Sequence, residues 1–309
     1  MPSPLPTLID CDPGTDDALA LLLAFASPEL DLRAITVVGG NLGLDRTLPN
    51  ACAVAGLAPQ PPPVHPGADR PLLGAFTPEP RVHGADGLGG VMLPPGPAAS
   101  PELAADAIRR HLRDSPDPVT LIGLGPATNL ALALATEPRL AANIAGFILM
   151  TGAWGEGNAT PAAEFNAFND PEALAIVLAC ARPVTLVGLE LTAQALATPA
   201  RLAAMAAAGP GRALAAAHAI QASVPPSARL GGTGAPLHDP CAVAYAIRPD
   251  LFGVRPAYVA IDLGPGPSRG RTVIDRWGRT GRPPNATIAE TLDADGFFAL
   301  LTARLAGLP

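Results

Sequence analysis

Short apolar runs that each end in a polar or glycine-rich turn constrain this chain more than any other feature. Examples are Leu32–Val38, Val119–Gly123, Ile144–Met150 and Pro183–Leu189, with runs of helical spacing between them. Strands that alternate with helices favour βαβ units, because neighbouring parallel strands need a crossover connection. We therefore expect an α/β fold with an open, mostly parallel sheet and helices on both faces.

Ligands of open parallel sheets bind where the strands end, so we expect any functional site at the carboxyl ends of the strands. The chain has 309 residues, of which 49% are hydrophobic, and this is enough for a sizeable core. The sequence shows neither an internal repeat nor a clear linker. We therefore predict one catalytic domain over residues 1–309.

The charge balance excludes several classes of function. The formal net charge is -7, and all 20 basic residues are arginines. A chain without lysine has no lysine for a phosphate-binding loop, a Schiff base or a general base. Nucleic acids need a basic surface, so we expect no nucleic-acid partner.

The four cysteines are scattered without paired spacing, so the sequence predicts neither a zinc site nor a disulfide framework. The first ten residues have no basic region and no long apolar segment, so we expect no signal peptide. No other segment is typical of a membrane span. We therefore expect a cytoplasmic protein that does not bind membranes.

The segment LPTLIDCDPGTDDA, residues 5–18, contains the densest group of candidate functional residues. It carries four aspartates in eight residues, Asp10, Asp12, Asp16 and Asp17. Carboxylates this close disfavour one another's ionisation, so a positive group is expected among them. A hard divalent cation such as calcium or magnesium fits oxygen ligands better than zinc does. Capping of the following helix explains one or two aspartates, but not four.

A second polar cluster lies between residues 150 and 170, where Asn158, Glu164 and Asn166 are candidates for binding a polyol. Each sugar hydroxyl must be matched when it leaves water, and short polar side chains do this. Asp170 precedes a proline and is better explained as the N-cap of a helix.

Four further polar residues at three places in the sequence allow two interpretations each. Asn41 follows a strand and is either a ligand for a hydroxyl or a turn residue. His83 lies in a segment rich in Gly and Pro and either lines a pocket or is exposed. His238 and Asp239 precede an apolar helix, either as a capping pair or as an acid beside a metal ligand.

Seven segments occur in an order and spacing that resemble the inosine-uridine preferring nucleoside hydrolases, calcium enzymes that cut the N-glycosidic bond of ribonucleosides. The segments are DCDPGTDDA, AITVVGGN, VHGADGLG, GPATNLA, NATPAAEFNAFNDPEA, GLELTAQALATPA and HDPCAVAYAI. The set is specific, whereas any one segment would be weak, and it extends from the first strand to the region of His238.

The resemblance implies that the chain hydrolyses ribonucleosides to ribose and free nucleobase, through metal-bound water and an oxocarbenium-like transition state. It implies that Asp12 is the general base and that His238 is the acid for the leaving group. Calcium would be held by the side chains of Asp10, Asp17 and Asp239 and by the main-chain carbonyl of Thr128. The residues expected to bind substrate are Asp16, Asn41, His83, Met150, Asn158, Glu164, Phe165 and Asn166. A homodimer or homotetramer is also implied.

Two departures from the family pattern affect the side of the leaving base. Ala193 stands where some members carry histidine, and the segment Arg229–Ala235 lacks the tyrosine that some members have before the His-Asp pair. The preferred nucleobase, purine or pyrimidine, therefore stays open, whereas metal and ribose binding are unaffected.

Two other functions compete with this interpretation. A magnesium-dependent aspartyl phosphatase also places Asp-x-Asp after a strand, as in Asp10 and Asp12, but it uses a basic residue, usually lysine, on the phosphoryl group. A non-catalytic sugar- or nucleoside-binding protein is the second alternative. Asp12 argues against it, because a spare carboxylate beside a metal has little use in simple binding.

Overall fold

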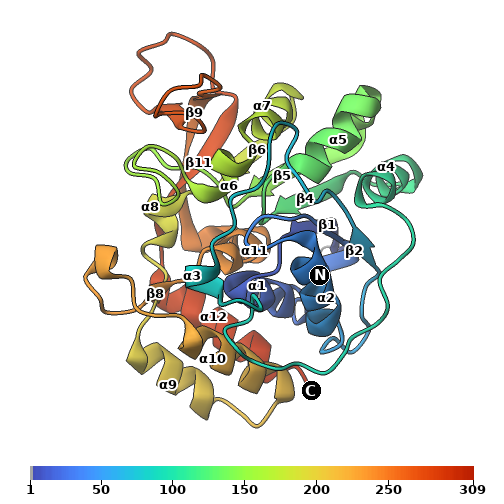
Figure 1. Ribbon diagram of the computed structural model, residues 1–309, viewed down its shortest axis with the longest axis vertical. Coiled ribbons are helices and arrows are strands. Elements are labelled where there is room, and N and C mark those ends of the chain that lie inside the picture. Colours follow the sequence, from blue (N-terminus) through green and yellow to red (C-terminus); the bar gives the residue numbers. More distant parts are fainter. Residues whose placement is uncertain (1–2) are drawn as a thin grey trace.

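The computed structural model describes residues 3–309 (Figure 1). Residues 1 and 2, which belong to the segment in which we expect no signal peptide, lie outside the described residues. Its centre is a nine-stranded sheet with the order β10-β9-β11-β6-β5-β4-β1-β2-β3, and β7 and β8 pair separately. The strands are β1 (Leu5–Cys11), β2 (Leu30–Val37), β3 (Val64–Pro66), β4 (Val119–Gly123), β5 (Ile144–Leu149), β6 (Val184–Leu186), β7 (Leu196–Ala197), β8 (Ala235–Pro236), β9 (Phe252–Ile261), β10 (Thr272–Asp275) and β11 (Ala286–Leu292).

Helices cover both faces of this sheet, with α4, α5 and α7 on one side and α1, α2, α11 and α12 on the other (Figure 1). The α-helices are α1 (Thr15–Phe25), α2 (Leu44–Ala55), α3 (Pro80–His83), α4 (Ala104–Asp114), α5 (Thr128–Thr136), α6 (Phe165–Asn169), α7 (Pro171–Ala179), α8 (Leu189–Thr192), α9 (Pro199–Ala207), α10 (Arg212–Ser223), α11 (Asp239–Ile247) and α12 (Ala294–Ala306). The 3-10 helices are η1 (Pro138–Asn143), η2 (Ala228–Leu230) and η3 (Pro249–Leu251).

The pairing of the strands confirms the expected fold class. From β3 through β2, β1, β4, β5 and β6 to β11, all neighbours run parallel. Only β9, next to the edge strand β10, runs opposite to its two neighbours. The parallel strands therefore end at one common edge, which is where a ligand site was expected. The single domain stays a prediction.

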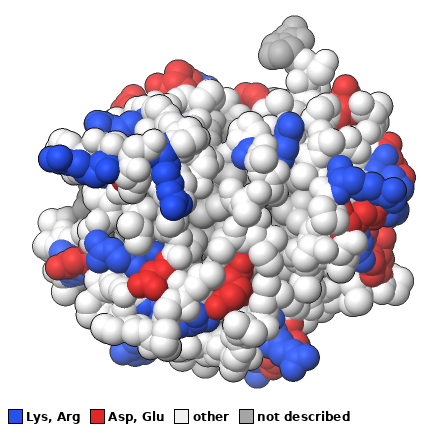
Figure 2. All heavy atoms as spheres, turned by 90° about the horizontal axis from the view of Figure 1, so that it is seen from above, with Lys and Arg blue, Asp and Glu red and all other residues white. Residues whose placement is uncertain are grey.

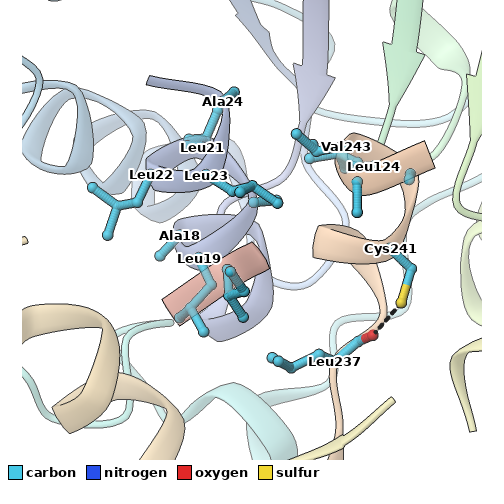
Figure 3. Packing of buried hydrophobic residues seen from close by; sticks show 14 of the residues in the cluster. Ala18, Leu19, Leu21, Leu22, Leu23, Ala24, Leu124, Leu237, Cys241 and Val243 are labelled. Atoms are coloured by element: carbon cyan, nitrogen blue, oxygen red, sulfur yellow. Dashed lines mark hydrogen bonds between the residues drawn. The ribbon is translucent and has the colours of Figure 1, made fainter. Parts of the chain in front are cut away.

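Helix α1 lies at the centre of one core. Its residues from Thr15 to Ala24 are all buried, as expected for a helix that is apolar on every side. Figure 3 shows leucines of α1 and residues of the segment that leads into α11 within this cluster, where Cys241 Sγ donates a hydrogen bond to the Leu237 carbonyl (3.1 Å). Because α1 is held this tightly, the aspartates at its start have little freedom to move apart.

Two elements differ from what the sequence predicts. The strand expected over Pro183–Leu189 is only β6, because Gly188 already begins α8. The strand β11 was not expected, although its residues alternate between apolar and polar.

The surface agrees with the composition. On the face in Figure 2, arginines and acidic side chains are interspersed on a largely uncharged surface and form no single basic patch. Several arginines are paired, for example Arg269 with Glu172 and Arg276 with Glu290. Within residues 3–309, no helix is both long and apolar enough to cross a bilayer.

Candidate active site

The ends of three neighbouring parallel strands form the floor of the candidate site. β1 leads into Asp12, β4 leads into Leu124, and β5 leads into Met150. The backbone N–H of Leu124 donates to the carbonyl of Asp10 (2.8 Å), so the ladder continues one residue past the strands. This rigid floor fixes the direction of the side chains that follow it.

A cavity of about 350 Å³ lies at this edge. All eight residues that were expected to bind substrate line it, together with the expected acid and one expected metal ligand: Asp16, Asn41, His83, Met150, Asn158, Glu164, Phe165, Asn166, His238 and Asp239. The structure thus brings these residues together from six separate segments, while their individual roles stay predictions.

Asp12 directly follows β1 and is buried, with 1% of its surface exposed, and it is not among the described residues that line the cavity. Its Oδ2 accepts a hydrogen bond from the backbone N–H of Asn41 (2.7 Å). Its Oδ1 is buried and has no partner in residues 3–309. Burial first, and then the charge of Asp17, raises the pKa of the Asp12 carboxyl well above its usual value. Such a group accepts a proton more readily than an exposed aspartate does.

Two glycines leave the space that the Asp12 side chain occupies. A Cβ at Gly125 would lie 2.5 Å from Asp12 Oδ1, and a Cβ at Gly40 would overlap Asp12 Oδ2. Both distances are shorter than any van der Waals contact, so a larger residue at either position forces Asp12 to move. The glycines therefore belong to the geometry of the site.

Three carboxylates form a group beside Asp12. Asp16 and Asp17 lie in the first turn of α1, Asp239 begins α11, and one oxygen of each lies within 4.8 Å of the others. Burial, followed by the charge of Asp16, raises the pKa of Asp17 to about 6. Burial and the charges of Asp16 and Asp17 raise the pKa of Asp239. Crowded, buried oxygen ligands of this kind suit a hard divalent cation.

Asp10, an expected metal ligand, lies outside that group of three. Its Oδ1 accepts hydrogen bonds from Thr36 Oγ1 (2.6 Å) and Asn129 Nδ2 (2.8 Å). Its Oδ2 is buried without a partner in the described part of the chain. Burial raises the pKa of Asp10 to about 7. One oxygen is therefore fixed by the protein, and the other remains available to a cation.

Thr128, whose main-chain carbonyl was expected to hold the metal, begins α5 away from the cavity lining. Its Oγ1 donates to Asp170 Oδ2 (2.7 Å), and Asp170 caps α7 by accepting from the backbone N–H of Ala173 (3.0 Å), as the sequence predicts. Among the described residues that line the cavity, the one at this strand end is Leu124. Leu124 is thus a second candidate to offer a main-chain carbonyl here, and the carbonyl of Thr128 stays a predicted ligand.

The two cavity histidines are held in different ways. The Nδ1 of His83 accepts a hydrogen bond from the backbone N–H of Thr15 (3.2 Å), so the proton of the neutral ring is on Nε2. The Nδ1 of His238 lies 2.7 Å from Thr192 Oγ1. Burial lowers the pKa of both histidines. His83 therefore offers its Nε2–H as a hydrogen-bond donor.

The remaining polar side chains are partly used by the protein itself. Glu164 caps α6 and accepts from Thr151 Oγ1, at 3.0 Å, and from the backbone N–H of Gly152, at 2.9 Å. Asn166 Nδ2 donates to the carbonyls of Leu124 (2.6 Å) and Met150 (2.9 Å). Glu164 and Asn166 can therefore offer only their remaining oxygen lone pairs to a ligand. The same two side chains also stabilise the wall of the cavity through these hydrogen bonds.

Asn41 organises the carboxylates. Its Nδ2 donates both to the carbonyl of Asp12 (3.1 Å) and to Asp17 Oδ2 (3.0 Å). Both amide hydrogens are thereby used, and only its Oδ1 remains for a ligand. Asn41 is therefore more than a turn residue or a ligand residue. Its side chain holds the segment after β2 against the start of α1 through these hydrogen bonds.

Sequence comparison relates this chain to known nucleoside hydrolases. The chain matches the family model described as inosine-uridine preferring nucleoside hydrolase over residues 7–299. The pyrimidine-specific ribonucleoside hydrolase RihA of Salmonella arizonae is 41% identical over 306 residues, which cover 97% of this chain and 98% of that protein. The same enzyme of Citrobacter koseri is 41% identical over 307 residues, 98% of each chain.

Two solved structures have the same fold over nearly their whole length. A plant nucleoside hydrolase, PpNRh1, superposes with a TM-score of 0.91 at 30% identity and covers 98% of this chain and 99% of its own. A purine-preferring ribonucleoside hydrolase from Gardnerella vaginalis gives a TM-score of 0.90 at 30% identity, with 98% of both chains covered.

Proposed function

Because the chain belongs to the inosine-uridine preferring nucleoside hydrolase family, we propose that it hydrolyses pyrimidine ribonucleosides with a calcium ion bound among its buried carboxylates. Family membership makes it a ribonucleoside hydrolase, an N-glycosyl hydrolase, and confirms the resemblance found in the seven segments. Membership also argues against the aspartyl phosphatase and the non-catalytic binder. The observation that carries the proposal is Asp12, buried with a free oxygen beside Asp16, Asp17 and Asp239.

Calcium is the cation that the ligand chemistry favours. The group offers only oxygen atoms, and calcium accepts six to eight of them in flexible geometry. The side chains of Asp17 and Asp239 would hold the calcium ion. The unpaired Oδ2 of Asp10 and the main-chain carbonyl of Leu124 are candidates for further ligands. When bound, the cation neutralises the carboxylates, orients the ribose hydroxyls and lowers the pKa of water beside it.

The chain's own residues supply the proton transfers and the orientation. Asp12 takes the proton of the attacking water at its unpaired Oδ1, as the anomeric carbon gains oxocarbenium character. Asp16 and the free oxygens of Asn41 and Asn166 accept hydrogen bonds from ribose hydroxyls. His238 stands beside the leaving base as its proton donor, with its ring held by Thr192.

The preference for pyrimidines rests on the relatives. The proteins named pyrimidine-specific are 41% identical to this chain, whereas the solved structure named purine-preferring is 30% identical. The expected cytoplasmic location and the homodimer or homotetramer stay proposals that the comparisons do not address. Size-exclusion chromatography with light scattering tests the assembly, and a monomer would contradict it.

The substrate is tested by measuring ribose release from uridine, cytidine, inosine and adenosine in phosphate-free buffer with calcium. We expect kcat/KM for the two pyrimidine nucleosides to exceed that for the purine nucleosides by about 10-fold or more, the range that pocket shape usually gives. Faster release from purines would refute the preference. Ribose release from none of the four would refute the function.

Gly125→Ala tests the position of Asp12 without changing any polar group. The added Cβ would lie 2.5 Å from Asp12 Oδ1, so the carboxylate must shift. We expect kcat to fall about 100-fold, because a displacement of about 1 Å costs a reaction that much. Steady-state kinetics measure kcat, and circular dichroism checks that the fold is kept. A kcat within twofold of the parent value would contradict the assigned role of this space.

A further inference from the structure

Gln221 is a buried polar residue for which the proposed reaction so far has no use. It lies in the last turn of α10, 2% exposed, and lines the cavity. Its Nε2 is buried and has no hydrogen-bond partner in residues 3–309. A buried amide nitrogen without a partner costs free energy, so the position needs an explanation other than stability.

The surroundings of Gln221 give it no substitute partner. The next residues of the cavity wall are Val224, Pro225 and Pro226, whose side chains are apolar. The next polar residue of the lining along the chain is Ser227, and Gln221 Nε2 does not bond to it.

Gln221 and His83 belong to one side of the cavity. The loop after His83 packs on the end of α10, since a Cβ at Gly89 would lie 2.7 Å from Ser223 Cβ. The carboxylates and Asn166 come instead from the strand ends and from α1, α6 and α11. His83 itself bonds to Thr15 at the start of α1, so it lies between the carboxylates and the end of α10. A ribose held at the carboxylates can therefore direct its base past His83 toward Gln221.

We propose that the Gln221 amide recognises the edge of the pyrimidine that lies opposite the glycosidic bond, and so determines substrate specificity. Uracil presents an N–H beside a carbonyl at this edge, and cytosine presents a ring nitrogen beside an amino group. A side-chain amide matches both, because a half-turn exchanges its donor and acceptor. This inference rests on the proposed hydrolysis of pyrimidine ribonucleosides.

The test compares Gln221→Leu with the parent protein on uridine, on 3-methyluridine and on 4-nitrophenyl β-ribofuranoside, which has no nucleobase edge. We expect kcat/KM for uridine to fall about 5–100-fold, the range for a lost buried hydrogen bond. The nitrophenyl riboside should change less than twofold. The parent protein should already be slow on 3-methyluridine, and the variant should lower that rate no further.

Thermal unfolding separates recognition from a structural role. Gln221→Leu removes a buried unpaired donor, so we expect its Tm to be equal to or above that of the parent. Gln194→Leu is the matched control, because the Gln194 side chain bonds to the backbone of Glu290 and Leu292. This variant should have a lower Tm than the parent, with an unchanged ratio of kcat/KM for uridine and for the nitrophenyl riboside. Gln221→Met serves if the leucine variant does not fold.

The outcomes are distinct. If the parent cleaves the nitrophenyl riboside but Gln221→Leu affects it as much as uridine, or affects neither, the inference about Gln221 is wrong and the hydrolase stands. If the folded, calcium-loaded parent cleaves no riboside at all, the proposed function fails and the inference fails with it.

Discussion

Asp12→Asn is expected to lower kcat for uridine about 10²–10⁴-fold, the usual contribution of a general base. The substitution keeps the shape of the side chain, and the amide oxygen can still accept from the backbone N–H of Asn41. The unpaired oxygen, however, no longer accepts a proton. Steady-state ribose release measures the effect, and KM should change much less than kcat.

The same variant tests the alternative of a simple binder. Calorimetry should show that Asp12→Asn still binds uridine, because its ribose ligands are untouched. Asp45→Asn is the matched control, since this aspartate is exposed and pairs weakly with Arg46 (3.9 Å). We expect Asp45→Asn to keep the kcat of the parent. If Asp12→Asn also keeps the kcat of the parent, Asp12 is not the general base.

Removal of calcium is expected to abolish activity and to make stability strongly dependent on pH. Burial raises the pKa of Asp10 to about 7 and that of Asp17 to about 6, and it raises those of Asp12 and Asp239 as well. An unfolded aspartate titrates near 3.9. Between roughly pH 4 and 7 the folded, metal-free protein therefore binds more protons than the unfolded chain.

A native state that binds more protons loses stability as the pH rises through this window. The metal-free protein should thus have a lower Tm at pH 8 than at pH 5. A bound cation neutralises the carboxylates in place of the missing protons. Calcium should therefore raise Tm by several degrees at pH 8, which is the shift expected when ligand binding stabilises the native state by about 2–3 kcal/mol. At pH 5 the increase should be much smaller.

Asp10→Asn is the matched variant for this prediction. Its amide oxygen can keep the hydrogen bonds from Thr36 and Asn129, while the charge disappears. We expect it to raise the Tm of the metal-free protein at pH 8 and to leave the Tm at pH 5 nearly unchanged. A calcium effect of equal size at pH 5 and pH 8 would contradict the account of the carboxylates.

Strands and helices with strong local signals could be predicted from the sequence. β4 has the predicted ends, because Val119–Gly123 is a short apolar run between turn residues. Asp170 caps its helix as predicted, because Pro171 can only follow an N-cap there. The order of strands could not be derived locally: β11 lies between β9 and β6, and only tertiary packing decides this.

The candidate site was predictable where residues follow strand ends, as for Asp12 and Asn41. Two details of the site could not be settled from the sequence, for physical reasons. The sequence does not distinguish one main-chain carbonyl from another, so Thr128 stays a predicted ligand beside the second candidate, Leu124. Gln221 was missed because it lies in an Ala-rich helix, and its place on the buried face is visible only from the spacing of Leu214, Ala217 and Ile220.

The most direct test of the central claim is the release of ribose and uracil from uridine, in phosphate-free buffer, by the calcium-loaded parent and by Asp12→Asn. The account predicts equal amounts of the two products from the parent and a rate at least 100-fold lower from the variant. Equal rates from the two proteins, or no ribose from the folded parent, would contradict it.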